Sequence, residues 1–160
     1  MTNIEFFMKR WESELPAFRK VLAAVPADKL DYKPHERSAS AGNLAFQLAF
    51  EQGDLEHLLT KQEAVFDPTV KRPATIDEIL EIWDRNTEKV RAALNAVDES
   101  KWDAPAKFKV GNDVVWEEPV YGMLWGFLFD MVHHRGQLSS YLRPMGAKVP
   151  AIYGPSGDER

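Results

Sequence analysis

Two pairs of polar side chains interrupt the apolar stripes of predicted helices at a four-residue spacing. Asp130 and His134 share a face with leucine, phenylalanine and methionine residues, and Gln47 and Glu51 share a leucine-rich face earlier in the chain. Residues four apart lie one turn above the other on a helix, so each pair points in one direction. A buried carboxylate or imidazole is costly unless it is paired or binds a cation. The two pairs are therefore expected to meet.

Three kinds of site fit these four residues. In the first, carboxylates and a histidine that project from facing helices hold a metal ion. In the second, Asp130 and His134 form an ion pair in a hydrogen-bonded core network capped by Gln47, which is the arrangement that periodicity alone favours. In the third, Asp130 orients His134, which acts as an acid or base near neutral pH without a metal.

Three more residues near the end of the chain bear on the same region. His133 lies about 100° around the helix from His134, so it is expected on the flank of the core beside Gln137, where it is the spare ligand for a metal. Gly136 in mid-helix costs about 1 kcal/mol relative to alanine and suggests close approach by another helix. Tyr153 follows the last helix in a proline-braced tail and is placed to close over the mouth of the site.

These residues need helices to position them, and four segments have apolar residues at the three- and four-residue spacings of amphipathic helices. No convincing strand run accompanies them. The pattern predicts an all-α four-helix bundle, in a single domain over residues 1–160. The helices are expected over about residues 4–22, 38–61, 75–97 and 119–143, and the first three begin at residues that can cap them: Thr2, Ser38 or Ser40, and Thr75.

The long connections between these helices carry their own signals. Lys109–Val115 has the pattern of a small hairpin ahead of the last helix, with Gly111-Asn112 as its turn. The connectors around residues 24–39, 61–75 and 96–118 are long enough to cross an end of the bundle. The topology therefore need not be simple up-and-down.

The composition excludes several classes of protein. With 160 residues and no cysteine, the chain has no disulfide scaffold, no cysteine-ligated metal and no thiol nucleophile of its own. Its 25 acidic against 20 basic residues give a net charge of −5, which disfavours nucleic acid as a partner. The apolar stretches are too interrupted for a membrane span, and the first five residues lack a signal-peptide layout. We expect a cytoplasmic protein.

The last helix and its tail carry a recognisable pattern. The run from Phe129 to Gly146, with its central His134-Arg135-Gly136-Gln137 motif, resembles the last helix of the DinB family, in the DinB/YfiT-like superfamily. The tail over residues 149–158, the connector over 30–34 and the segment over 37–44 are also similar to that family. The resemblance covers nearly the whole chain, and the His-Arg-Gly-Gln motif is its most specific part.

The resemblance implies a bundle with up-down-down-up connectivity, commonly dimeric, and a divalent metal site inside one end, with zinc or nickel as the expected ion. The family's ligands are a histidine on the second helix and two residues four apart on the last. By position these are Gln47, Asp130 and His134, so Gln47 stands where the family has histidine. Glu51, one turn on, or His133 is the expected substitute ligand.

The resemblance also implies the kind of activity. It indicates a thiol-dependent transferase or a hydrolase acting on a small molecule, with His134 as a ligand and Glu51 as a fourth ligand or proton acceptor. A low-molecular-weight thiol would then be a diffusible cosubstrate, because the chain has none. The alternative is a non-catalytic, stress-related binding protein with a degenerate or metal-free site. In either case we expect a homodimer, with Gly136 and aromatic flanks at its interface, and no DNA or membrane partner.

Overall fold

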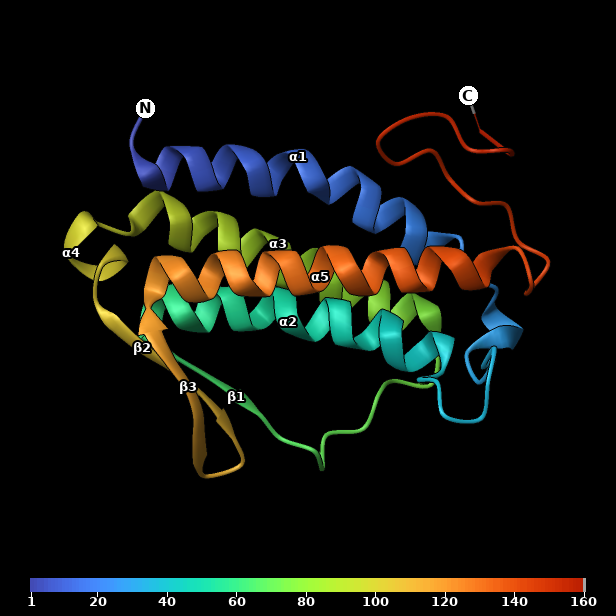
Figure 1. Cartoon of the computed structure of the whole chain (residues 1–160), viewed down its shortest axis with the longest axis horizontal. Helices are drawn as coiled ribbons and strands as arrows, with labels where there is room; N and C mark the ends of the chain where they lie inside the picture. Colours follow the sequence, from blue (N-terminus) through green and yellow to red (C-terminus); the bar gives the residue numbers. More distant parts are fainter. Residues whose placement is uncertain (160) are drawn as a thin grey trace.

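Four long helices form a bundle in the structure, a computed structural model that describes residues 1–159. α1 and α5 run in one direction and α2 and α3 in the other, which confirms the up-down-down-up connectivity (Figure 1). α2 packs against α3 and α5, and α1 packs against the same two helices from the other side. The bounds are α1 Asn3–Ala23, α2 Ala41–Lys61, α3 Ile76–Ala96 and α5 Val120–Leu142, with short helices at Ala27–Lys29 and Glu99–Trp102 (α4).

The helix starts follow from their caps. At α1 the Thr2 hydroxyl accepts from the Glu5 amide at 3.1 Å, while the Glu5 carboxylate accepts from the Thr2 amide at 2.7 Å. Thr75 forms the same capping box ahead of α3, and Ser40, rather than Ser38, caps α2. These side chains satisfy amides that have no partner within the helix, so the predicted starts are confirmed.

A three-stranded sheet lies across one end of the bundle (Figure 1). The predicted hairpin is confirmed but is longer than expected. Its strands β2 (Pro105–Val110) and β3 (Asp113–Pro119) pair from Val110 and Asp113 at the turn as far as Pro105 and Pro119. Gly111 at the turn has φ +59°, a conformation that glycine adopts without strain. β1 (Glu63–Phe66) adds a parallel third strand beside β2. Four residues are too few for a period-two pattern, so the sequence did not predict β1.

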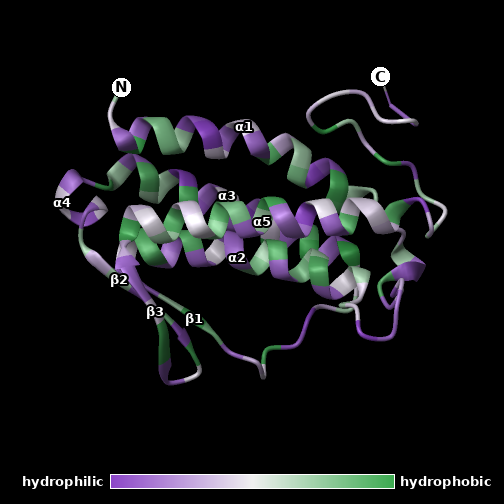
Figure 2. Cartoon of the chain, viewed as in Figure 1, coloured by the Kyte–Doolittle hydropathy of each residue, from purple (hydrophilic) through white to green (hydrophobic). Residues whose placement is uncertain are grey.

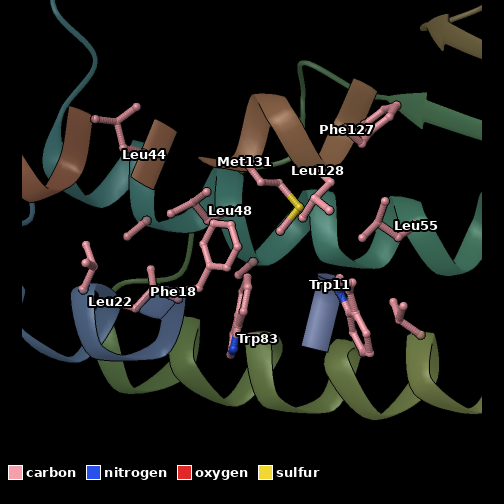
Figure 3. Close-up of a cluster of buried hydrophobic side chains, with 14 of the residues drawn as sticks. Trp11, Phe18, Leu22, Leu44, Leu48, Leu55, Trp83, Phe127, Leu128 and Met131 are labelled. Carbon is pink, nitrogen blue, oxygen red and sulfur yellow. The ribbon is translucent and has the colours of Figure 1, made fainter. Parts of the chain in front are cut away.

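Apolar side chains from all four long helices fill the space between them. Figure 2 shows hydrophobic and hydrophilic residues alternating along the long helices, as expected for amphipathic helices. Figure 3 shows Phe18 of α1 beside Trp83 of α3, and their ring centroids lie 5.3 Å apart. No helix within residues 1–159 combines the length and hydrophobicity needed to cross a membrane.

One ion pair lies inside the bundle. Arg135 of α5 is 2% exposed and donates to the Glu14 carboxylate of α1 at 2.7 Å. The Tyr153 hydroxyl lies 2.6 Å from the guanidinium of Arg135 and donates to Glu14 at 2.8 Å, while the guanidinium also stacks over the Phe18 ring. The pair, together with Tyr153, thus joins α1, α5 and the C-terminal tail. Arg135 of the His-Arg-Gly-Gln motif therefore has a role in the fold, through its contact with Glu14.

Removing the charge of Glu14 should destabilise the fold. Glu14→Gln keeps the shape of the side chain but leaves Arg135 buried without its counter-charge, so we expect the free energy of unfolding to fall by about 3 kcal/mol. The measurement is urea unfolding at neutral pH. The control is Glu12→Gln, whose carboxylate contacts Arg91 at 3.4 Å at the surface; we expect a loss below about 1 kcal/mol there. Equal losses in the two variants would contradict a buried ion pair.

Candidate metal centre

A cavity of about 650 Å³ opens between α2, α5 and the sheet. Its walls are mostly aromatic, with phenylalanines from both helices and from the strands and one tryptophan from β3. Four acidic side chains and one arginine also line it: Glu51, Asp54, Asp67, Asp130 and Arg72. An apolar cavity with a few convergent polar groups is the usual form of a small-molecule site.

Three of the predicted site residues converge at this cavity. One ligand atom from each of Glu51, Asp130 and His134 can be chosen so that all three atoms lie within 4.8 Å of one another. Asp130 Oδ2 lies 3.2 Å from His134 Nε2, one turn apart on α5, and Glu51 reaches them from α2. The four-residue spacing on α5 and the facing position on α2 therefore bring two carboxylates and an imidazole together. This donor set can hold a metal ion.

Glu51 is the most constrained member of the cluster. It is 7% exposed, and its Oε1 accepts a hydrogen bond from Gln47 Nε2 at 2.7 Å. Its Oε2 is buried without a hydrogen-bond partner among the described residues. Burial raises the pKa of Glu51 to about 8, the Gln47 bond opposes that rise, and the nearby Asp130 carboxylate adds to it. Without a cation, Glu51 therefore holds a proton at neutral pH.

The imidazole of His134 is oriented by a neighbour on its own helix. Gln137 Oε1 lies 2.8 Å from His134 Nδ1. Because an amide oxygen only accepts, Gln137 Oε1 is the acceptor for Nδ1–H, and Nε2 is the ring nitrogen that faces Asp130. The sequence placed Gln137 on the side of the helix that carries His133, and the structure shows that its side chain bonds His134, three residues before it.

Gln47 and His133 take different places from those the sequence gave them. Gln47 lines the cavity, but its amide donates to Glu51 instead of capping the Asp130–His134 pair. The side chain of Asp130 is 52% exposed. The predicted contact between Asp130 and His134 is therefore present, whereas the Gln47 cap and the burial of Asp130 are not. His133 is exposed and lies outside the converging group of ligand atoms, although its ring contacts that of His134.

Two other expectations are corrected by the structure. Gly136 is exposed, and a side chain built there would meet nothing within 4 Å, so no other helix of residues 1–159 approaches it. Tyr153 does not close over the cavity. Its hydroxyl is held by Arg135 and Glu14, neither of which lines that cavity.

Asp54 is a cavity residue that the sequence analysis missed. Its side chain lines the cavity one turn beyond Glu51, and the residue is 3% exposed. Within residues 1–159 its carboxylate forms no hydrogen bond or ion pair, and burial raises its pKa to about 7. The signal was present, because Asp54 stands three residues after Glu51 and seven after Gln47, on the same helix face.

Comparison with known proteins places this chain in a family. A profile of the DinB family matches residues 1–159. The uncharacterised protein YrdA of Bacillus subtilis (strain 168) is 25% identical over 159 residues, which cover 98% of this chain and 92% of YrdA.

Two solved structures share the fold. A DinB-like protein of B. subtilis, YjoA, superposes with a TM-score of 0.70 at 19% identity and covers 97% of this chain and 100% of its own. A mycothiol-dependent maleylpyruvate isomerase superposes with a TM-score of 0.53 at 11% identity, over 95% of this chain and 68% of that one.

The burial of Asp54 predicts a pH dependence of stability. Its pKa is about 7 in the folded chain against 3.8 for a free aspartate, so between these values the folded chain binds more protons than the unfolded chain. Stability therefore falls as pH rises through this window. Asp54→Asn should remove about 2 kcal/mol of that fall between pH 5 and 7 in metal-free protein. Urea unfolding at several pH values measures it.

The matched control is Asp67→Asn, which changes an exposed carboxylate of the same cavity. The pKa of Asp67 is lowered by its hydrogen bonds to Thr69, so Asp67 is ionised in both states across pH 5 to 7. Its variant should keep the wild-type slope. If Asp54→Asn also kept that slope, Asp54 would be ionised in the folded chain and the predicted burial effect would be wrong.

Proposed function

This chain belongs to the DinB family, and on that premise we propose that it is a metal-dependent enzyme acting on a small molecule. Glu51, Asp130 and His134 would hold a divalent ion at the wall of the cavity, and the substrate would occupy the cavity beside it. One observation carries the proposal: two carboxylates and an imidazole from facing helices converge within 4.8 Å at the wall of a cavity large enough for a small molecule.

The residues present fit a divalent ion. Two carboxylates at close range repel one another unless a proton or a cation lies between them. Glu51 Oε2 is buried with no hydrogen-bond partner in residues 1–159, and a cation would satisfy it. Two oxygens and one imidazole nitrogen make a harder donor set than several histidines, and it suits first-row divalent ions. Three protein ligands with an open position are typical of catalytic sites.

When bound, the ion supplies a Lewis acid that lowers the pKa of a water or thiol nucleophile at neutral pH. Gln47 holds Glu51 Oε1 and so aims Oε2 into the site, while Gln137 keeps the hydrogen of His134 on Nδ1. The aromatic walls exclude water and pack against the apolar part of the substrate. As a ligand Glu51 would be ionised; in the alternative role, in which it does not bind the ion, it would be the group that accepts a proton from the reacting molecule.

A thiol in this reaction would have to come from solution. The chain has no cysteine, so thiol-dependent transfer requires a low-molecular-weight thiol as a cosubstrate. The shared fold with a mycothiol-dependent isomerase supports thiol transfer as the reaction type, with hydrolysis as the other candidate. Gln47, in place of the family's histidine, favours a second function, a binding protein without catalysis. Metal bound at full occupancy without turnover of either kind would support that alternative.

Metal content is the first test of the proposal. Untagged protein, reconstituted with zinc, nickel, manganese or iron and desalted, should retain about one equivalent of one ion by elemental analysis. Glu51→Gln and His134→Ala each remove a ligand, so each should weaken affinity at least about tenfold. His133→Ala is the control, since His133 is exposed and outside the cluster, and it should bind like the wild type. Less than about a tenth of an equivalent of every ion would refute the metal centre.

Gln47→His tests how close position 47 lies to the ion. Imidazole binds first-row ions better than an amide oxygen, and Gln47 already contacts Glu51, so we expect affinity to rise about tenfold. Competition with a chelating dye gives the affinity. The control is Asn43→His, one turn earlier on the same helix and also on the cavity wall but without a contact to Glu51. Unchanged affinity in Gln47→His would show that position 47 does not face the ion.

A further inference from the structure

The proposed metal centre does not account for one buried carboxyl group of the cavity, that of Asp54. Asp54 is 3% exposed and lines the cavity, yet it does not belong to the group of ligand atoms formed by Glu51, Asp130 and His134. A buried carboxylate needs a proton, a hydrogen-bond donor or a cation. Among residues 1–159, Asp54 has no hydrogen-bond donor or ion-pair partner, and burial is the sole cause of its raised pKa, with no cation near enough to oppose the rise.

Residues 1–159 offer no free cation for this position. Among them Arg72 is the one basic residue on the cavity wall, and its guanidinium pairs with Asp31 and donates to the carbonyl oxygen of Pro73. The other charged residues of the wall are acidic. The cavity therefore has an excess of negative charge, and two of those charges, on Glu51 and Asp130, would be neutralised by the proposed ion. Asp54 would remain.

Aromatic rings surround the same space. Phe46 and Phe50 precede Asp54 at four-residue spacing on α2, so they lie on the same side of the helix and line the cavity with it. Their ring centroids are 5.9 Å apart. Faces of such rings carry partial negative charge and attract cations, above all weakly hydrated alkylammonium groups.

A second aromatic cluster lines the cavity from α5 and the sheet. Phe127 of α5 packs against Phe108 of β2, with centroids 5.4 Å apart, and stacks with Trp116 of β3 at 6.2 Å. Gly126 allows this packing, because a Cβ at that position would lie 2.4 Å from the Trp116 ring. The cavity thus combines two aromatic walls with one unpaired carboxylate.

We propose that the cavity recognises a substrate with a positively charged amine on an apolar body, and that Asp54 binds the amine while the two aromatic walls hold the body. The assignment rests on the proposed function in taking this cavity as the substrate site. Asp54 is a binding residue and not a metal ligand. Its carboxylate offsets the hydration free energy that the ammonium group loses on leaving water. The rings of Phe46 and Phe50 add a cation–π contribution.

The test compares three probes of one shape that differ in charge: phenethylamine, which is cationic, 2-phenylethanol, which is neutral, and phenylacetate, which is anionic. Calorimetric titration at neutral pH gives their affinities for the full chain. We expect the amine to bind at least about tenfold more tightly than the alcohol, and the acid to bind most weakly, because a charged hydrogen bond in a partly desolvated site contributes that much. A wild-type protein that binds amine and alcohol equally would overturn the proposal.

Variants then assign the preference to one carboxylate. Asp54→Asn should lower the affinity for phenethylamine about tenfold and leave 2-phenylethanol unchanged. Asp67→Asn, which alters an exposed acid of the same cavity, should change neither. Equal losses in both variants would show that the general negative potential of the cavity selects the amine. No loss in Asp54→Asn would show that another group binds it.

A variant of the aromatic wall shows whether the probes bind in the cavity, and titrations with and without metal separate the result from the proposed metal centre. Trp116→Leu removes part of one aromatic wall, so it should weaken the amine and the alcohol to the same extent; no change in either would show that the probes bind elsewhere and would overturn the proposal. All titrations are made on both metal-loaded and metal-free protein. If the chain retains no metal, the proposed function fails, whereas the dependence on Asp54 still decides the substrate class. Asp54→Asn should retain as much metal as the wild type.

Discussion

An ionisable group between packed helices must meet an opposite charge, a proton or a ligand, and this constraint determines how the interior of the bundle is divided. On the side facing α1, Arg135 meets Glu14, and the charges are paired within the chain. On the side facing α2 and the sheet, the carboxylates of Glu51 and Asp54 have no arginine or lysine of residues 1–159 paired with them. The Arg135–Glu14 pair links two helices of the bundle. The unpaired carboxylates line a cavity in which we propose that a ligand binds.

The two arrangements meet in the motif of α5. His134 and Arg135 are adjacent, so their side chains leave the helix about 100° apart and reach different partners. Arg135 reaches α1 and the tail, whereas His134 faces Asp130 and Glu51 and is oriented by Gln137. The motif is therefore part scaffold and part site. A substitution at Arg135 should be interpreted through stability, and one at His134 through ligand binding.

The sequence predicted the features that depend on neighbours along the chain. The four helices, their caps and the stacking of Asp130 on His134 follow from spacings of three or four residues, and all are present in the structure. It also predicted that the two polar pairs meet, and Glu51 does converge with Asp130 and His134. It did not predict the partner of Arg135. Glu14 and Arg135 are 121 positions apart, and periodicity shows the face of a helix without showing what covers it. Asp54 was overlooked for a related reason: its position on the face was visible, but its isolation from any cation was not.

The glutamine at position 47 bears on both the proposed metal centre and the proposed substrate class. A site with neutral imidazole ligands leaves the full double positive charge of a divalent ion at the cavity wall, and that charge would repel an amine nearby. With Glu51 and Asp130 as ligands the two negative charges cancel it, and Gln47 contributes a hydrogen bond to Glu51 without adding charge. Asp54 would then remain as the buried carboxylate without a counter-charge among residues 1–159. On the proposed ligand set, a carboxylate in place of an imidazole would weaken the Lewis acid and would also make the site compatible with the proposed cationic substrate.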